Sequence, residues 1–326
     1  MKKHPETFYV TTPIYYVNDR PHIGHAYCTV LADVLRRFHT MFGAETYFLT
    51  GVDEHGQKVE EAAKKRGLTP QAHCDEMQAH FRDLWPTLDV ANDDFIRTTE
   101  ERHIRVVQEA LQWLHQRDLI YRGEYEGFYS PRVEKFFTEA ELKDGRCPET
   151  GGEVHKIKEA NYFFRMSLYR DQLIDHIHKH PDFIRPESRR NEVLGFLAQP
   201  LSDLCISRPK KRLSWGIELP FDPDYVTYVW FDALLNYASA IGLYADPPRF
   251  EHWWPGVRHL IGKDILTTHC MYWMTMLMAL EIPLPKEVIA HGWWLIDDTK
   301  MSKSLGNVSA PWPCATRSGP TRCATS

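Results

Sequence analysis

The chain has 326 residues, of which 43% are hydrophobic and 25% charged, which fits an ordinary soluble globular protein of about two domains. Its net charge of −5 argues against a general nucleic-acid coat protein, which would be basic. No signal-like apolar core opens the chain, no apolar run is long enough for a membrane span, and the seven cysteines have no framework spacing, so we expect a cytoplasmic protein with no membrane partner.

Strand and helix patterns alternate in the first part of the chain. A β-branched and aromatic run predicts a strand, and the apolar residues that follow recur at spacings of three and four, as in an amphipathic helix. The expected elements are a strand over Phe8–Val17, a helix over Ile23–Phe42, a strand over Thr46–Val52, a helix over Gln57–Arg66, and helices over Pro70–Leu88 and Glu101–Gln116. Strand, helix and strand in this order indicate a parallel βαβ unit.

The texture changes near Leu119, and a polar, turn-rich stretch over Gly123–Lys158 predicts an inserted β-rich module. Beyond it we expect a helix over Glu187–Leu204, a strand over Tyr225–Val229, a helix over Trp230–Gly242, a strand ending at Gly262, a helix over Ile265–Leu280 and a strand over Val288–Ile296. The prediction is an α/β domain split into halves at 1–118 and 221–308 by an insertion at 119–220, with an irregular tail at 309–326.

The string His22-Ile23-Gly24-His25 lies where the first strand gives way to the first helix. Gly24 lets a nucleotide approach the backbone, and a helix N-terminus offers free N–H groups to phosphate. Two imidazoles there could stabilise charge that builds up on a phosphate. Two surface histidines near a helix start would be the plainer interpretation if the string stood alone.

A second string, Lys300-Met301-Ser302-Lys303-Ser304, follows the last expected strand. Lysine is a mobile point charge suited to a polyphosphate, and the serines add hydroxyl donors. Alone it could be a solvated basic turn. Together, in this order and setting, the two strings resemble the signature pair of the class I aminoacyl-tRNA synthetases. That resemblance implies a Rossmann-like parallel-sheet nucleotide-binding domain split by a smaller inserted connective domain.

Longer strings resemble the methionyl-tRNA synthetases in particular, from about Phe8 to Val308 and in the shorter bacterial form. They are Thr12-Pro13-Ile14-Tyr15-Tyr16-Val17-Asn18, Gly51-Val52-Asp53-Glu54-His55-Gly56, Ile206-Ser207-Arg208-Pro209, Tyr228-Val229-Trp230-Phe231-Asp232-Ala233-Leu234-Leu235-Asn236-Tyr237 and His259-Leu260-Ile261-Gly262-Lys263-Asp264-Ile265. The resemblance implies a methionine pocket of Ile14, Tyr16, Trp230, Ala233, Tyr237 and His269, with Asp53 holding the ammonium group. A thioether suits such a flexible, aromatic cavity, although ordinary core packing would otherwise explain these aromatics.

The resemblance also implies the reaction. Methionine is activated with ATP and Mg²⁺ and is then transferred to tRNA(Met). The residues that would handle ATP are His22, Gly24, His25, Gly262, Asp264, Lys300, Ser302 and Lys303, of which His22, His25, Lys300 and Lys303 would be catalytic. The methionine carboxylate is already ionised near neutral pH, so positioning and charge stabilisation suffice without a general base.

Many relatives carry a zinc knuckle in the inserted module. The matching positions read Ser130-Pro131-Arg132-Val133 and Cys147-Pro148-Glu149-Thr150, so only Cys147 remains as a ligand and we expect no zinc. The resemblance stops after Val308, where the family would continue into an anticodon-binding bundle, so we expect that bundle to be absent and tRNA charging to be impaired. If the family-like string Asp-Ala-Leu-Arg-Tyr-Phe is written in GC-rich codons and those codons are read one base later, they encode residues 321–326. We therefore expect a frameshift in the gene or in its sequencing, and re-reading the DNA would check this.

Three rival interpretations stay open. Another class I synthetase would need a thiol-binding zinc site for cysteine or a larger editing insertion for branched-chain residues. A small nucleotidyltransferase would be shorter and would lack the Tyr228–Tyr237 string. A fragment that only binds partners is favoured by the unusual tail and disfavoured by the intact His22, His25 and Lys303.

Overall fold

The computed structural model describes residues 6–131, 135–137, 139–148, 150–293, 295–296 and 299–300. Its centre is a seven-stranded, all-parallel sheet with β1 in the middle. The strands, in spatial order, are β4 (Asp94–Arg97), β3 (Glu45–Asp53), β1 (Thr7–Thr11) with β2 (Tyr15–Tyr16) continuing beside the end of β3, β13 (Val257–Gly262), β14 (Glu287–His291) and β8 (Ile184–Arg185).

Successive residues of the central strands face two different cores, as the pleat of a strand requires. Phe8 and Val10 of β1 belong to one buried cluster, whereas Tyr9 between them belongs to the other. Phe48 and Leu49 of β3 divide in the same way. A parallel sheet buried on both faces must be covered by helices on both sides.

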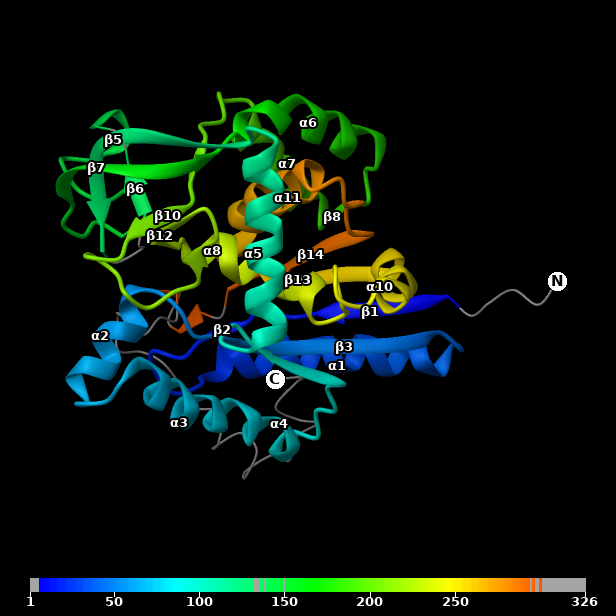
Figure 1. The fold of residues 1–326 in the computed structure, drawn as a ribbon. Helices are drawn as coiled ribbons and strands as arrows, with labels where there is room; N and C mark the ends of the chain where they lie inside the picture. Colours follow the sequence, from blue (N-terminus) through cyan, green and yellow to red (C-terminus); the bar gives the residue numbers. More distant parts are fainter. Residues whose placement is uncertain are drawn as a thin grey trace.

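The helices provide that cover, with α1, α3 and α4 below the sheet and α6, α7 and α11 above it (Figure 1). Their bounds are α1 (Ile23–Met41), α2 (Gln57–Lys65), α3 (Pro70–Arg82), α4 (Leu84–Thr87), α5 (Glu101–Gln116), α6 (Arg170–Lys179), α7 (Glu187–Leu197), α8 (Val229–Leu234), α9 (Asn236–Ser239), α10 (Pro247–Trp253) and α11 (Met274–Ala279). Short 3₁₀ helices cover Glu139–Glu141, Met166–Tyr169, Trp254–Gly256 and Lys263–Ile265, and Thr268–Trp273 is π-helical. Within the described ranges, no helix is both long enough and apolar enough to span a lipid bilayer.

Antiparallel strands form a separate group at the end of the molecule opposite α3 and α4 (Figure 1). One sheet contains β5 (Ile120–Ser130), β6 (Lys135–Phe137), β7 (His155–Phe164) and β9 (Leu204–Cys205), a second contains β10 (Ser207–Pro209), β11 (Glu218–Leu219) and β12 (Asp222–Thr227), and β15 (Leu295–Ile296) pairs with β16 (Thr299–Lys300). Strand β8 falls inside the range 119–220 assigned to the insertion, yet it pairs with β14 in the central sheet.

The predicted α/β class with an inserted module is confirmed, and so are the helices expected at Ile23 and over Glu101–Gln116. Several expected elements end early or divide, because proline and glycine interrupt them. The strand predicted over Phe8–Val17 divides into β1 and β2 around Pro13. The helix predicted to reach Leu204 ends at Leu197, shortly before Pro200.

The later predictions also needed correction. The helix predicted over Trp230–Gly242 forms two short pieces, α8 and α9. The helix expected from Ile265 begins with 3₁₀ and π-helical turns before it becomes α11. The strand expected to reach Ile296 ends at His291, and β4 and β8 were not predicted.

Candidate active site

The central sheet reverses its strand order between β1 and β13. From β1 the chain moves outward through β3 and β4, whereas β13 and β14 lie on the other side of β1. In open parallel sheets, ligands bind in the crevice beyond the carboxyl ends of the strands at such a reversal. Strands β2, β3, β13 and β14 end at that edge with Tyr16, Asp53, Gly262 and His291.

A buried histidine joins the two strands at the reversal. The Thr11 hydroxyl lies 2.8 Å from Nδ1 of His259, and Trp273 donates from its indole to His259 Nε2 at 3.0 Å. Because Nε2 accepts, the ring hydrogen is on Nδ1 and is donated to Thr11. Burial holds the pKa of His259 well below its ordinary value, so the ring is neutral and clamps β1, β13 and the π-helical turn.

His22 and His25 cap the N-terminus of α1 reciprocally. Nδ1 of His22 accepts from the Gly24 N–H at 3.1 Å, and Nδ1 of His25 accepts from the His22 N–H at 3.2 Å. The two rings stack with their centroids 3.7 Å apart. Since each Nδ1 is an acceptor, each neutral ring carries its hydrogen on Nε2. The cap therefore fixes the tautomer and places both ring hydrogens on Nε2, at a positive helix end.

The surroundings of these histidines keep both rings in place. A Cβ on Gly24 would lie 3.1 Å from two atoms of the His22 ring, so a side chain there would disturb the cap. Tyr15 packs against His25 with ring centroids 4.6 Å apart, donates to the His25 carbonyl at 3.2 Å and lies 2.7 Å from the Thr29 hydroxyl. Tyr15 was not among the predicted site residues, although it lies within one of the quoted strings.

The predicted methionine-pocket residues come from both halves of the sheet. Tyr16 and Asp53 are register partners in β2 and β3, so their side chains share one face. Asp53 is 7% exposed at the end of β3 and lies close enough to Tyr237 to influence it electrostatically. Ile14, Tyr16 and Trp230 are half-buried and pack against the core cluster that contains Tyr237.

Tyr237 and His269 form a buried hydrogen-bonded pair. Nδ1 of His269 donates to the Ile265 carbonyl at 3.1 Å, so Nε2 accepts from the Tyr237 hydroxyl at 2.7 Å. Burial lowers the pKa of His269 to about 4, and burial also raises the pKa of Tyr237. Both groups are therefore neutral at physiological pH. Ala233, buried on α8, is a small residue between Trp230 and Tyr237 in sequence.

Gly262 and Asp264 lie at the end of β13, beside the β1–β13 reversal. A Cβ on Gly262 would be 2.6 Å from Oδ1 of Asp264, so only glycine lets the exposed Asp264 carboxylate keep this position. Next to them, Lys263 places its ammonium 3.6 Å from the centroid of the Trp293 ring. The glycine thus controls an acidic group at the edge expected to receive ATP.

Part of the second predicted motif lies outside the described residues. The backbone of Lys300 pairs with Leu295 in β16, and Ser302 and Lys303 belong to the range that is not described. In the inserted module, Gly151 donates to the Cys147 carbonyl at 2.8 Å and Cys147 donates to the Gly152 carbonyl at 3.0 Å, which forms a tight turn. The described side chains contain no group of three or more His, Cys, Asp or Glu that could hold a metal ion. The expectation of no zinc stays a prediction, because Arg132, Val133 and Glu149 are not described.

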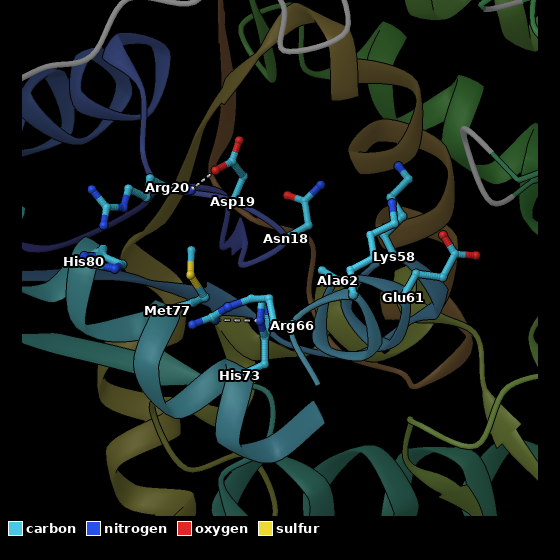
Figure 2. Close-up of a pocket in the computed structure, with 11 residues that line it drawn as sticks. Asn18, Asp19, Arg20, Lys58, Glu61, Ala62, Arg66, His73, Met77 and His80 are labelled. Atoms are coloured by element: carbon cyan, nitrogen blue, oxygen red, sulfur yellow. Dashed lines mark hydrogen bonds between the residues drawn. The ribbon is translucent and has the colours of Figure 1, made fainter. Parts of the chain in front are cut away.

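A separate cavity of about 510 Å³ lies beside the loop that leads into α1. Its lining is mostly polar and includes none of the predicted site residues. The lining residues are Asn18, Asp19, Arg20, Lys58, Glu61, Ala62, Lys65, Arg66, His73, Met77 and His80. Figure 2 shows Arg20 and Lys58 extending away from each other, and Arg66 reaching His73. Arg20 and Lys58 therefore do not converge on one point of this cavity (Figure 2).

Three buried residues without a predicted role also meet, close in sequence to the predicted methionine-pocket residues Asp53 and Trp230. Asp232 lies 2.7 Å from Nδ1 of His55 and 2.8 Å from Nε2 of His103. His55 and Asp232 occur in quoted strings, and His103 lies on the predicted α5. Spacing along the chain gave no signal of their contact, because 177 positions separate His55 from Asp232.

The family model described as "tRNA synthetases class I (M)" matches residues 8–156 and 150–317. The chain therefore belongs to the class I tRNA synthetases, the class that the reversed parallel sheet and the two-histidine helix start define. Within that class it belongs to the family designated M. The match extends to residue 317, past Val308, where the resemblance had been expected to stop.

Curated relatives agree in name. A "Methionine--tRNA ligase" of Fusobacterium nucleatum is 50% identical over 96% of this chain and 49% of its own length. One of Caldanaerobacter subterraneus is 48% identical over 98% of this chain and 49% of its own length. The chain thus spans about half the length of these relatives.

Two solved structures of methionyl-tRNA synthetase from Mycobacterium tuberculosis also match. The one in complex with methionyl-adenylate has a TM-score of 0.91 and 42% identity over 97% of this chain and 62% of its own. The apo, free-state structure has a TM-score of 0.80 and 35% identity over 99% of this chain and 61% of its own.

Proposed function

We propose that this chain activates L-methionine with ATP to form methionyl-adenylate, and that the same site then transfers the methionyl group to tRNA(Met). The observation that carries the proposal is the helix cap in which His22 and His25 both bear their ring hydrogens on Nε2. The pairing of Tyr16 with the buried Asp53 at the carboxyl ends of β2 and β3 supports it. The similarity to a methionyl-adenylate complex supports it, since the backbone is closer to that structure than to the free-state one.

The pocket would hold methionine by its two ends. The thioether would lie among Ile14, Tyr16, Trp230, Ala233, Tyr237 and His269, where aromatic contacts to sulfur are favourable. Asp53 would accept hydrogen bonds from the ammonium group, a charge-assisted interaction within a largely buried site. Because Tyr237 and His269 are neutral, they present no competing charge to the side chain.

Adenylate formation would be an in-line displacement at the α-phosphate. A methionine carboxylate oxygen forms the new bond to phosphorus, the bond to the bridging oxygen breaks, and pyrophosphate leaves with that electron pair. The Nε2–H groups of His22 and His25 would donate to the phosphate as its charge grows. Gly24 and Gly262 would let the nucleotide approach the backbone beside Asp264.

The second motif would act on the leaving group. We propose that Lys300, Ser302 and Lys303 bind the pyrophosphate, and that ATP enters as its Mg²⁺ complex, so the metal arrives with the substrate. In the second step a terminal ribose hydroxyl of tRNA would attack the adenylate carbonyl and release AMP. The transfer step is the less strongly supported part of the proposal, because this chain matches only 49% of the length of the Fusobacterium nucleatum relative.

Methionine-dependent exchange of pyrophosphate into ATP tests the first step on the 326-residue chain. We expect exchange with methionine, none with isoleucine, and loss of exchange in Lys303→Ala. A folded chain without exchange would refute activation and favour a protein that only binds partners. Charging of tRNA(Met) is measured separately, so failure of the second step alone would leave the first intact.

A further inference from the structure

One buried side-chain network connects the walls of the methionine pocket. We call it the Asp232 bridge, and its members are His55, His103, Asp232 and Ser239. Asp232 holds His55 Nδ1 at 2.7 Å with one oxygen and His103 Nε2 at 2.8 Å with the other. His103 Nδ1 then lies 2.8 Å from the Ser239 hydroxyl, which donates to the Asn236 carbonyl at 3.2 Å.

Each end of the bridge lies next to a proposed pocket residue. His55 follows Asp53 by two positions, directly after β3. Asp232 lies between Trp230 and Ala233 on α8, and Ser239 shares the short helix α9 with Tyr237. The bridge therefore ties the ammonium-binding side of the pocket to its thioether-binding side through α5.

The bridge holds an ionised carboxylate away from water. Asp232 and His103 are fully buried, and His55 is 5% exposed. Burial alone would raise the pKa of Asp232, but the charge and hydrogen bonds of His55 and His103 outweigh burial and leave this pKa below its ordinary value. Removing one partner of a buried ionic group leaves an uncompensated charge, which costs far more than losing a surface pair.

Helix α8 depends on contacts of this kind for its orientation. Helices α8 and α9 have six and four residues, too few to hold their own geometry, so their orientation depends on tertiary contacts. The two oxygens of Asp232 fix α8 in two directions, toward β3 and toward α5. Because Asp232 is inaccessible, it acts on the substrate only through the groups that it positions.

We propose that Asp232 is a positioning residue for methionine, setting the distance between Asp53 and the Trp230–Tyr237 wall through His55 and through His103 and Ser239. The inference rests on the proposed function and names a determinant of its substrate pocket. It predicts that loosening the bridge weakens methionine binding, while ATP binding, which is assigned to residues outside the bridge, is retained.

Asp232→Asn is the direct test, since the amide keeps the shape and removes the charge. We expect KM for methionine in pyrophosphate exchange to rise about tenfold or more, because misplacement on the order of 1 Å can cost about a hundredfold. KM for ATP should change by less than about twofold, which is small compared with the about hundredfold effect of misplacing a substrate. Calorimetric titration with methionine in the absence of nucleotide should show the same loss of affinity.

Ser239→Ala is a milder second variant at the far end, and it carries the test if Asp232→Asn does not fold. It should weaken methionine binding by about threefold, roughly the effect of one weakened hydrogen bond. Asp94→Asn is the matched control, because Asp94 pairs with Arg102 at 2.7 Å, next to His103 on α5, but at the amino end of β4. This control should lose stability and keep both KM values.

The outcomes separate the two proposals. If the wild-type chain neither exchanges pyrophosphate nor binds methionine, the proposed function fails. If the wild type is active and folded Asp232→Asn and Ser239→Ala bind methionine as it does, positioning by the bridge is refuted. Equal increases in both KM values, or the same methionine defect in Asp94→Asn, would show a general structural role and would also refute the inference.

Discussion

At the scale of single residues, His25 has two separate tasks. Its Nδ1 closes the helix cap, which places the ring hydrogen on Nε2, and we propose that this Nε2–H donates to the phosphate. His25→Ala should reduce kcat for pyrophosphate exchange by about 100-fold to 1,000-fold, as loss of one preorganised donor does. The loss of stability should stay near 1 kcal/mol, typical of a lost cap.

Rapid-quench measurement of adenylate formation checks the predicted loss of rate, and urea unfolding of the same preparation checks the predicted loss of stability. His180→Ala is a suitable control, because His180 is an exposed residue at the end of α6, remote from the site. A rate loss below tenfold in His25→Ala, with the cap-sized loss of stability, would remove His25 from the phosphate chemistry.

His269 predicts how stability depends on pH. Burial lowers its pKa to about 4, against 6.5 for an ordinary histidine, so the unfolded chain binds the extra proton first. The contribution of neutral His269 is therefore complete above about pH 6.5 and is lost as pH falls toward 4. Between pH 7 and pH 5 this should cost on the order of 2 kcal/mol.

Urea unfolding at both pH values measures the effect, with His269→Asn as the comparison. The variant lacks the titrating ring, so its free energy of unfolding should fall less between pH 7 and pH 5, by a difference on the order of 2 kcal/mol. Carboxylates titrate alike in both proteins and cancel in the difference. Identical losses would mean that His269 keeps an ordinary pKa and that the Tyr237 contact does not exclude the proton.

At the scale of elements, the end of β13 depends on one glycine. In Gly262→Ala the new methyl group would meet Asp264 Oδ1 at 2.6 Å and force the carboxylate to move. We expect KM for ATP to rise about tenfold, equivalent to roughly 1.4 kcal/mol, with little change in KM for methionine. Steady-state exchange at varied ATP measures it.

Gly195→Ala provides the matched control. Gly195 lies inside α7 with nothing within 4 Å of an added Cβ, so alanine should raise stability by up to about 1 kcal/mol and leave both KM values unchanged. If Gly262→Ala also left KM for ATP unchanged, Asp264 would have no part in nucleotide binding.

Elements also show where sequence patterns suffice and where they do not. Helices α1 and α5 were predicted because their apolar residues repeat over many turns, and β3 because it is a long buried run. Strands β4 and β8 have four and two residues, too short for a recognisable period. The π-helical turn at Thr268–Trp273 has no sequence period either, and it carries His269.

The candidate site divides in a similar way. Resemblance located Asp53 and His25 by position, because they lie in contiguous strings. It gave no contact between elements far apart in the chain, such as His259 with Thr11 or Asp232 with His55. Those contacts follow from strand order and from the packing of short helices, which depend on the whole fold.

At the scale of the whole molecule, the proposed site joins parts that are distant in sequence. Strands β1–β3 supply Tyr16 and Asp53, the segment from α8 supplies Tyr237, and β13 supplies Gly262. A ligand that contacts all of them should bind only when both halves of the sheet are assembled. Such a ligand must then stabilise the complete fold rather than one half.

A non-hydrolysable methionyl-adenylate analogue tests this coupling by thermal unfolding. At a free concentration of about 100 times its Kd it should add about 2.7 kcal/mol of stability and raise Tm by about 4 °C in a single transition. Methionine alone should give less, because it does not reach the residues proposed to bind the nucleotide, such as Gly262, and an isoleucyl analogue should give no shift at the same concentration. A split transition in which only one part responds to the analogue would show that the two halves of the sheet bind ligand independently, against the shared site inferred from the strand order.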